Sequence, residues 1–146
     1  MPEEKIAGIM REFVKAMAAG EVEKNLSYLT DDAVVIDPYG TYKGKEAIKS
    51  QLAAMSRNMK DMKITETGNG IIAQGNKAFF EHVISGTFQG KKFEMLAMCA
   101  YEFSGDKIKG VRTVYDRLLV AKQVVTGWPA KPIVNMVVKQ SEKGMK

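Results

Sequence analysis

The chain has 146 residues, 45% of them hydrophobic and 27% charged, and a formal net charge of +5. This length and composition suit one domain with its own core and exclude a solenoid or a low-complexity segment, and the scattered lysines argue against a nucleic-acid partner. The single cysteine, Cys99, excludes a disulfide framework, and no stretch resembles a signal peptide or a membrane span, so we expect a cytoplasmic protein.

The first third of the chain predicts three helices. Apolar residues recur every three or four positions from residue 6 to residue 17, behind two glutamates that suit a helix N-terminus, and Gly20 ends the pattern. A second, short helix is expected over 22–29 and a third over about 45–59. Because so few residues separate the first two helices, we expect them to form a helical hairpin.

A short apolar strand is expected between the second and third helices, over residues 31–37. It ends at Asp37 because Pro38 has no N–H for a sheet ladder and Tyr39-Gly40 supplies a turn. Asp37 is open to two interpretations. Its carboxylate is a reactive group presented at the end of a strand, or its side chain caps the turn that follows.

From residue 62 the apolar period changes from about 3.6 to two. Glycine-containing turns separate strands expected over 62–74, 77–88, 91–103 and 107–116, and Gly68-Asn69-Gly70 predicts a bulge in the first of them. Helices followed by an antiparallel meander predict an α+β fold in which the helices cover one face of the sheet.

Alternation along these strands separates two faces of the sheet. One face is apolar and aromatic with a few polar groups, and the other mixes apolar residues with paired charges. We expect the helices and a pocket to cover the first face, and a second subunit to cover the other in an isologous dimer. The first face includes the candidate pocket residues Phe80, His82, Cys99, Tyr101, Thr113 and Tyr115.

Residues 28–40, which include Asp31-Asp32-Ala33 and Asp37-Pro38-Tyr39-Gly40, resemble the nuclear-transport-factor-like superfamily, and within it the SnoaL-like polyketide-cyclase and ketosteroid-isomerase branches. Segments 43–48 and 103–108 continue the resemblance, which extends over about residues 4–116. It implies a conical, cystatin-like α+β fold, in which three N-terminal helices pack on a curved mixed or antiparallel sheet and enclose one pocket, in a homodimer. We place this domain at residues 1–125 and a basic amphipathic tail at residues 126–146.

The same resemblance suggests roles for three residues. Asp37 lies where the isomerases keep their general base. Phe13 and Cys99 stand where those enzymes keep a tyrosine and a protonated aspartic acid, so the usual donors to a developing enolate are missing. Steroid isomerisation by the family's mechanism is therefore disfavoured, and Phe13 and Cys99 are expected to line the pocket.

His82 is the only histidine and is expected on the pocket face, where Asp37 could orient it as an acid or base. The alternative is a core histidine bonded to a backbone carbonyl or a tyrosine. Tyr101 and Tyr115 share that face and could polarise a substrate carbonyl or hold a ligand at the rim, and Tyr39 is expected near the mouth.

Two other candidate groups are expected to be structural. Buried Cys99 should have a raised pKa and be inert. Asp116 resembles a position used by SnoaL-like cyclases, but alternation turns it away from Tyr115, and a surface pair with Arg112 or Arg117 explains it. One histidine and separated carboxylates give no ligand spacing, so we expect no metal and no cofactor.

Two functions remain open from the sequence. The first is a cofactor-free isomerase, cyclase or dehydratase acting on a hydrophobic aromatic or polycyclic carbonyl compound, with Asp37 as base and His82 as its partner. The second is a non-catalytic pocket for a lipid-like small molecule, or a dimeric scaffold. The first requires both side chains in one open cavity, and the second predicts Asp37 bound to backbone amides in a sealed or apolar cavity.

The tail predicts a helix, because apolar and lysine-rich faces alternate after Pro132. Such a helix could cover the pocket mouth, clamp a second subunit, or lie on an anionic membrane with Trp128 at the interface. The modest basic face favours the first two over membrane contact.

Overall fold

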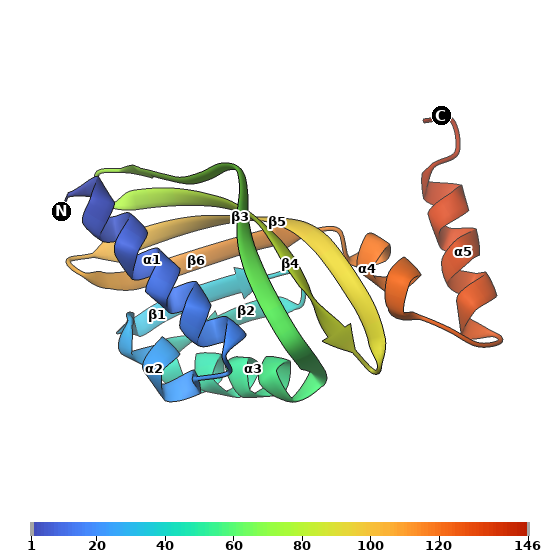
Figure 1. The fold of residues 1–146 in the computed structure, drawn as a ribbon, viewed down its shortest axis with the longest axis horizontal. Helices are drawn as coiled ribbons and strands as arrows, with labels where there is room; N and C mark the ends of the chain where they lie inside the picture. The colour runs from blue at the N-terminus through green and yellow to red at the C-terminus, as the bar shows by residue number, and fades with distance from the viewer. Residues whose placement is uncertain (1, 146) are drawn as a thin grey trace.

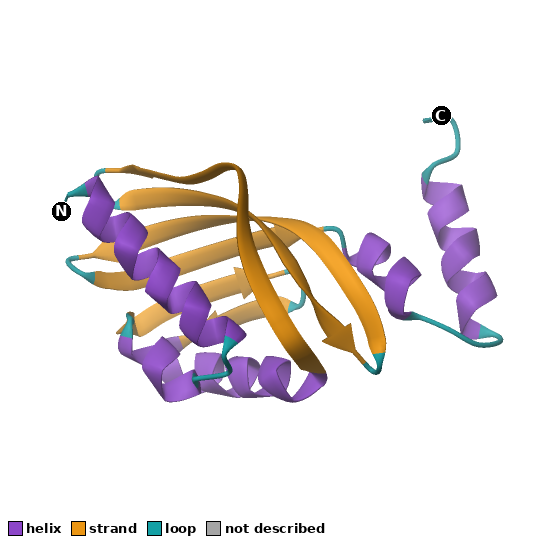
Figure 2. Cartoon of the chain, viewed as in Figure 1, coloured by secondary structure: helices purple, strands orange, loops and turns teal. Residues whose placement is uncertain are grey.

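A computed structural model of the chain describes residues 2–145 and shows three helices that pack on a curved sheet and two further helices after its last strand (Figures 1 and 2). The helices are α1 (Glu3–Ala18), α2 (Val22–Ser27), α3 (Gly44–Asn58), α4 (Arg117–Val124) and α5 (Ala130–Ser141). The strands are β1 (Leu29–Asp37), β2 (Gly40–Lys43), β3 (Met59–Gln74), β4 (Lys77–Phe88), β5 (Lys91–Ser104) and β6 (Lys107–Tyr115). The predicted α+β class and N-terminal helices are confirmed. The outer limits of the predicted domain and tail, residues 1 and 146, lie outside the described residues.

The strands form one six-stranded mixed sheet in the order β2-β1-β6-β5-β4-β3. From β3 to β6 the strands make the antiparallel meander that the glycine turns predict, whereas β1 runs parallel to β6, with Val35 opposite Val111. After the predicted turn at Tyr39-Gly40, residues 40–43 form β2, a strand that the sequence analysis did not predict, and it pairs with β1 so that Asp37 lies opposite Gly40. The sheet is not closed into a barrel.

The core lies between α1, α3 and the concave face of the sheet. From α1, Ile6, Met10 and Phe13 are almost fully buried, and a side chain of this size stabilises a fold by about 1.5–3 kcal/mol on burial. Fully buried Asn25 fastens α2 to α1, because its amide donates to the Phe13 carbonyl over 2.6 Å. The helical hairpin is therefore held by both packing and a buried hydrogen bond.

β3 bends sharply over the sheet in Figure 1, at the bulge predicted from Gly68-Asn69-Gly70. Its register against β4 shifts between Glu66 and Ile71, and Gly68 has a φ of +56°. The Asn69 amide donates to Glu81 Oε2 over 3.2 Å, and a Cβ on Gly68 would lie 2.0 Å from Glu81 Oε1. Gly68 is therefore required both by its backbone angle and by this close approach.

The chain after β6 forms two helices that lie beyond one end of the sheet (Figure 1). The sequence predicts α5 but not α4. Asp116 caps α4, since its Oδ1 accepts from the amides of Leu118 and Leu119 over 2.9 and 3.0 Å, so the expected surface pair with an arginine is wrong. Within residues 2–145, no helix is long and apolar enough to cross a bilayer.

Gln123 attaches α4 to the sheet. Its side-chain amide forms two 2.8 Å hydrogen bonds with the backbone N–H and carbonyl of Glu94 on β5, as a neighbouring strand would. α5 packs on α4 and stands apart from the sheet. Of the three placements that the sequence left open for the tail, covering the pocket is not the one seen in the described residues, because none of those in α5 lines the cavity described below.

Candidate functional site

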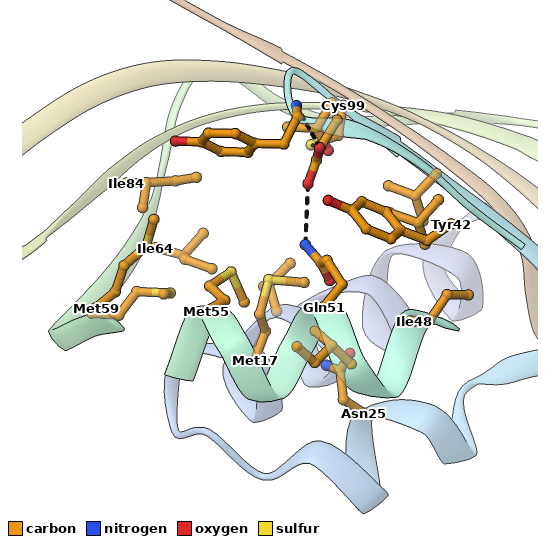
Figure 3. Close-up of a pocket in the computed structure, with 18 of the residues that line it drawn as sticks. Met17, Asn25, Tyr42, Ile48, Gln51, Met55, Met59, Ile64, Ile84 and Cys99 are labelled. Atoms are coloured by element: carbon orange, nitrogen blue, oxygen red, sulfur yellow. Dashed lines mark hydrogen bonds between the residues drawn. The ribbon is translucent and has the colours of Figure 1, made fainter. Parts of the chain in front are cut away.

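A cavity of about 740 Å³ lies between α1, α3 and the concave face of the sheet. Most of its wall is apolar, and five methionines contribute to it: Met17, Met55, Met59, Met62 and Met95. Figure 3 shows Met17, Met55 and Met59 side by side above α3, facing Ile64 and Ile84. Because methionine is unbranched and polarisable, such a wall adapts to ligands of different shape.

Asp37 lies half-buried on the cavity wall, at the end of β1. Its Oδ1 accepts from the backbone amides of Tyr39 and Gly40 over 2.7 and 3.0 Å, and its Oδ2 accepts from the Gln51 side-chain amide over 3.1 Å. The turn-capping interpretation of Asp37 is therefore confirmed for Oδ1, while Oδ2 is held on the side of α3.

Gln51 was missed by the sequence reasoning. It extends from α3 across the cavity, and the dashed line in Figure 3 marks its bond to the carboxylate. A signal was present, because position 51 lies three residues after Ile48 and four before Met55, on the apolar face of the helix. A single polar residue on the apolar face of a helix indicates a polar group that is turned toward the core or a cavity.

Aromatic residues surround the carboxylate at the cavity rim. Tyr39 is 58% exposed, its ring lies 6.4 Å from that of Tyr115, and the Arg117 guanidinium stacks 4.6 Å above it while donating to the Pro38 carbonyl over 3.0 Å. Burial raises the pKa of Tyr115 far above its ordinary value, and Tyr39 and the charge of Asp37 raise it further. Tyr115 is therefore a neutral phenol at the cavity rim, next to the ring of Tyr39.

His82 lies on the cavity wall in β4 and is only 3% exposed. Its ring stacks on Phe80 with a centroid distance of 4.2 Å, and its Nδ1 has no hydrogen-bond partner among the described residues. Burial lowers the pKa of His82, partly opposed by the Phe80 backbone, so the imidazole is neutral at pH 7.

The predicted pairing of Asp37 with His82 is wrong, although both line the same cavity. Tyr39, Gly40 and Gln51 satisfy the carboxylate instead. The two residues stand on β1 and β4, with β6 and β5 between them, which separates their backbones by about 14 Å along the sheet. The curved sheet therefore presents an acid and an imidazole at two separate places.

Most other predicted pocket residues lie on the cavity wall: Phe13, Cys99, Tyr101 and Thr113. The Phe13 ring meets that of Tyr101 edge-on, and Cys99 Sγ lies 3.1 Å from Thr113 Oγ1. Burial raises the pKa of Cys99 to about 11, as expected for an inert thiol. Phe80 is the exception, because it is buried in the core behind His82 and is not part of the wall.

The curved mixed sheet, the three helices on its concave face and the apolar cavity between them define a cup of the nuclear-transport-factor-like class. A family model described as a SnoaL-like domain matches residues 10–111. The chain belongs to this SnoaL-like family. In the part of the chain that the structure describes, no three histidine, cysteine or acidic side chains are grouped so that they could hold a metal ion.

Solved structures share this fold at low sequence identity. A putative polyketide cyclase from Silicibacter sp. TM1040 has a TM-score of 0.77 and 20% identity, over 86% of this chain and 99% of that one. A hypothetical protein from Catenulispora acidiphila, of ketosteroid isomerase-like fold and in complex with trimethylamine, has a TM-score of 0.74 and 21% identity, over 84% and 94%. An epoxide hydrolase of LEH-like type from M. tuberculosis has a TM-score of 0.72 and 15% identity, over 94% and 98%.

Proposed function

We propose that this protein binds an apolar carbonyl compound in its cavity and acts on it as a cofactor-free isomerase, cyclase or dehydratase, with Asp37 as the general base. The observation that carries the proposal is a half-buried carboxylate set in the wall of a 740 Å³ apolar cavity. The polyketide cyclase and the epoxide hydrolase among the structural neighbours are consistent with catalysis in such a cup.

The proposed first step is removal of a proton from the carbon next to the ligand carbonyl. The proton moves to Asp37, and the electron pair of the broken C–H bond moves onto the carbonyl oxygen to give an enolate. The neutral Tyr115 phenol at the cavity rim would donate a hydrogen bond to that oxygen. In a β,γ-unsaturated ligand, return of the proton from Asp37 to the γ-carbon of the dienolate completes an isomerisation. In a β-hydroxy ligand, the enolate expels the β-hydroxyl, which takes the proton from Asp37 and leaves as water, and this completes a dehydration.

A second candidate function is non-catalytic binding of a hydrophobic small molecule. The hydrogen bonds of Asp37 favour it, because two backbone amides and one side-chain amide already satisfy the carboxylate. Because both functions use the same cavity, ligand binding alone does not distinguish them. Only the catalytic function predicts that the protein accelerates proton transfer from the ligand.

The experiment follows exchange of the acetyl protons of 4-acetylbiphenyl in D₂O by proton NMR. We expect the wild-type protein to accelerate exchange above the buffer rate, and Asp37→Asn to lower that acceleration by about 100-fold or more, since general-base catalysis typically contributes this much. Asp32→Asn is the matched control, because Asp32 is an exposed acid on the same strand, and it should exchange at the wild-type rate.

Thermal shift with the same ketone decides between the candidates when exchange is not accelerated. Stabilisation of the wild-type protein with exchange at the buffer rate would support non-catalytic binding. Neither stabilisation nor exchange would contradict both functions for this class of ligand.

We also propose that the outer face of the sheet forms a homodimer interface. Leu96, Met98 and Val114 are 49%, 36% and 64% exposed there, and Val114 lies opposite Met98 in neighbouring strands. Glu102 and Arg112 on the same face supply both signs of charge, which suits a surface that meets its own copy. This leaves the cavity, on the opposite face, accessible in each subunit.

A further inference from the structure

We propose that His82 is a second ligand-anchoring site, which hydrogen-bonds a hydroxyl group at the end of the ligand farthest from Asp37. The inference deepens the proposed function, because it names the ligand as an apolar ring compound with a carbonyl at the mouth of the cavity and a hydroxyl at its buried end.

The first argument is the unsatisfied imidazole. The His82 side chain is 3% exposed and lines the cavity, yet its Nδ1 has no partner among residues 2–145. A buried polar group without a hydrogen bond is costly, so such groups in folded proteins normally have a partner. Asp37 is not the partner of Nδ1, because it stands three strand positions away in the same sheet and its oxygens already accept hydrogen bonds from other groups. A bound ligand is the partner that the cavity can bring.

The second argument is the chemistry of a neutral imidazole in an apolar wall. Its neighbours are the ring of Phe80 on the same strand, Ala97 opposite it on β5 and Glu66 opposite it on β3. Phe80 and Ala97 carry no charge, and the Glu66 carboxylate is already paired with the Arg11 guanidinium over 2.6 Å. A charged ligand group would lose its hydration here without an opposite charge to replace it. A hydroxyl both donates and accepts, so it can bond either tautomer of the imidazole, whereas a ketone can bond only the donor nitrogen.

The third argument is spacing. The backbones of Asp37 and His82 are separated by three strand spacings, or about 14 Å along the curved sheet. A ligand that reaches both must be long and rigid, with polar groups at its two ends and an apolar middle. The methionines and isoleucines of the cavity wall provide a matching apolar surface, and Figure 3 shows Met55, Ile64 and Ile84 among them.

The experiment compares 4-acetyl-4′-hydroxybiphenyl with 4-acetylbiphenyl, which lacks only the hydroxyl. Affinities are measured by calorimetry for wild-type protein, His82→Phe and His82→Gln. We expect wild-type protein to bind the hydroxylated probe about 10-fold more tightly, as one buried hydrogen bond allows, and His82→Phe to lose this preference while it still binds 4-acetylbiphenyl. His82→Gln keeps a hydrogen-bonding group and should retain part of the preference.

A second readout does not depend on any variant. His82 is the only histidine in the chain, so its imidazole ¹⁵N resonances are unambiguous. We expect the hydroxylated probe to shift one of them and 4-acetylbiphenyl to leave both nearly unchanged. Equal affinities for the two probes in wild-type protein, with no difference in the imidazole signals, would overturn the inference.

These outcomes are separable from those of the proposed function. Asp37-dependent proton exchange without a preference for the hydroxyl would overturn the anchoring role and leave the catalytic proposal intact. A His82-dependent preference without exchange would support the anchor and contradict Asp37 as a base.

Discussion

Asp37 shows how one residue can serve the fold and the site together. Its Oδ1 closes the turn between β1 and β2, and its Oδ2 faces α3, where Gln51 holds it. Any substitution at this position therefore changes the turn as well as the chemistry. Asparagine is the informative replacement because its carbonyl oxygen can still cap the turn while it loses the negative charge.

His82 makes stability depend on pH at the residue scale. Burial lowers its folded-state pKa below the ordinary value near 6.5, so between these two pKa values the unfolded chain binds a proton that the folded chain does not. The free energy of unfolding should therefore fall as pH decreases below about 6.5, with a slope of up to about 1.4 kcal/mol per pH unit from this one group.

Urea unfolding of wild-type protein and His82→Phe between pH 5 and pH 8 checks this expectation. The difference in slope between the two proteins isolates the histidine, since the carboxylates are common to both. Parallel stability curves for the two proteins would show that His82 titrates alike in the folded and unfolded chain.

For single residues, the sequence could predict which side chains lie on the cavity wall but not which groups those side chains contact. Strict alternation placed His82, Cys99 and Tyr115 on one face, and Pro38 fixed where β1 stops. The partner of Asp37 could not be predicted in the same way, because Gln51 comes from a different element: its place on the apolar face of α3 marks it as unusual but does not say which group it contacts.

Two elements were missed by the sequence patterns, β2 and the longer α4. None of the residues of α4 is buried, and no apolar stripe runs along it, so its position depends on Asp116 and Gln123 rather than on packing. β2 was missed for a related reason, since four residues are too few to show a period. Helices and strands with long apolar patterns, by contrast, were predicted to within about three residues.

The attachment of α4 to β5 can be tested at Gln123. Gln123→Ala removes both bonds to the Glu94 backbone, so we expect the Glu94 amide to exchange with solvent at least about 10-fold faster while the core amides of β5 stay protected. Hydrogen exchange followed by NMR gives the measurement. Gln140→Ala on α5 is the matched control and should leave the Glu94 amide unchanged, whereas similar exchange rates in all three proteins would show that α4 does not depend on Gln123.

For the molecule as a whole, the fold class was predictable because it follows from the order of helical and alternating segments. The parallel pairing of β1 with β6 was not, since it joins segments more than seventy residues apart and leaves no local signal. That pairing sets the end of β1 beside β6 and so places Asp37 in the cavity. The place of Asp37 on the cavity wall thus depends on the strand pairing that joins the most distant segments of the chain.

The proposed dimer is tested at the same scale. We expect wild-type protein to sediment as a dimer and Leu96→Lys to sediment as a monomer, because two added charges would face each other across an apolar interface. Leu119→Lys is a matched control on α4, where the leucine is 45% exposed and lies off the sheet face, and it should remain dimeric. A dimer that tolerates Leu96→Lys would place the interface elsewhere.

The five methionines around the cavity also carry a chemical liability. Thioethers take up oxygen from peroxides and become sulfoxides, which are polar and bulkier. Such a change would make the apolar wall of the cavity polar without altering the backbone. Because these positions hold methionine rather than leucine, oxidation should weaken ligand binding. Enzymatic reduction of the sulfoxides should restore it.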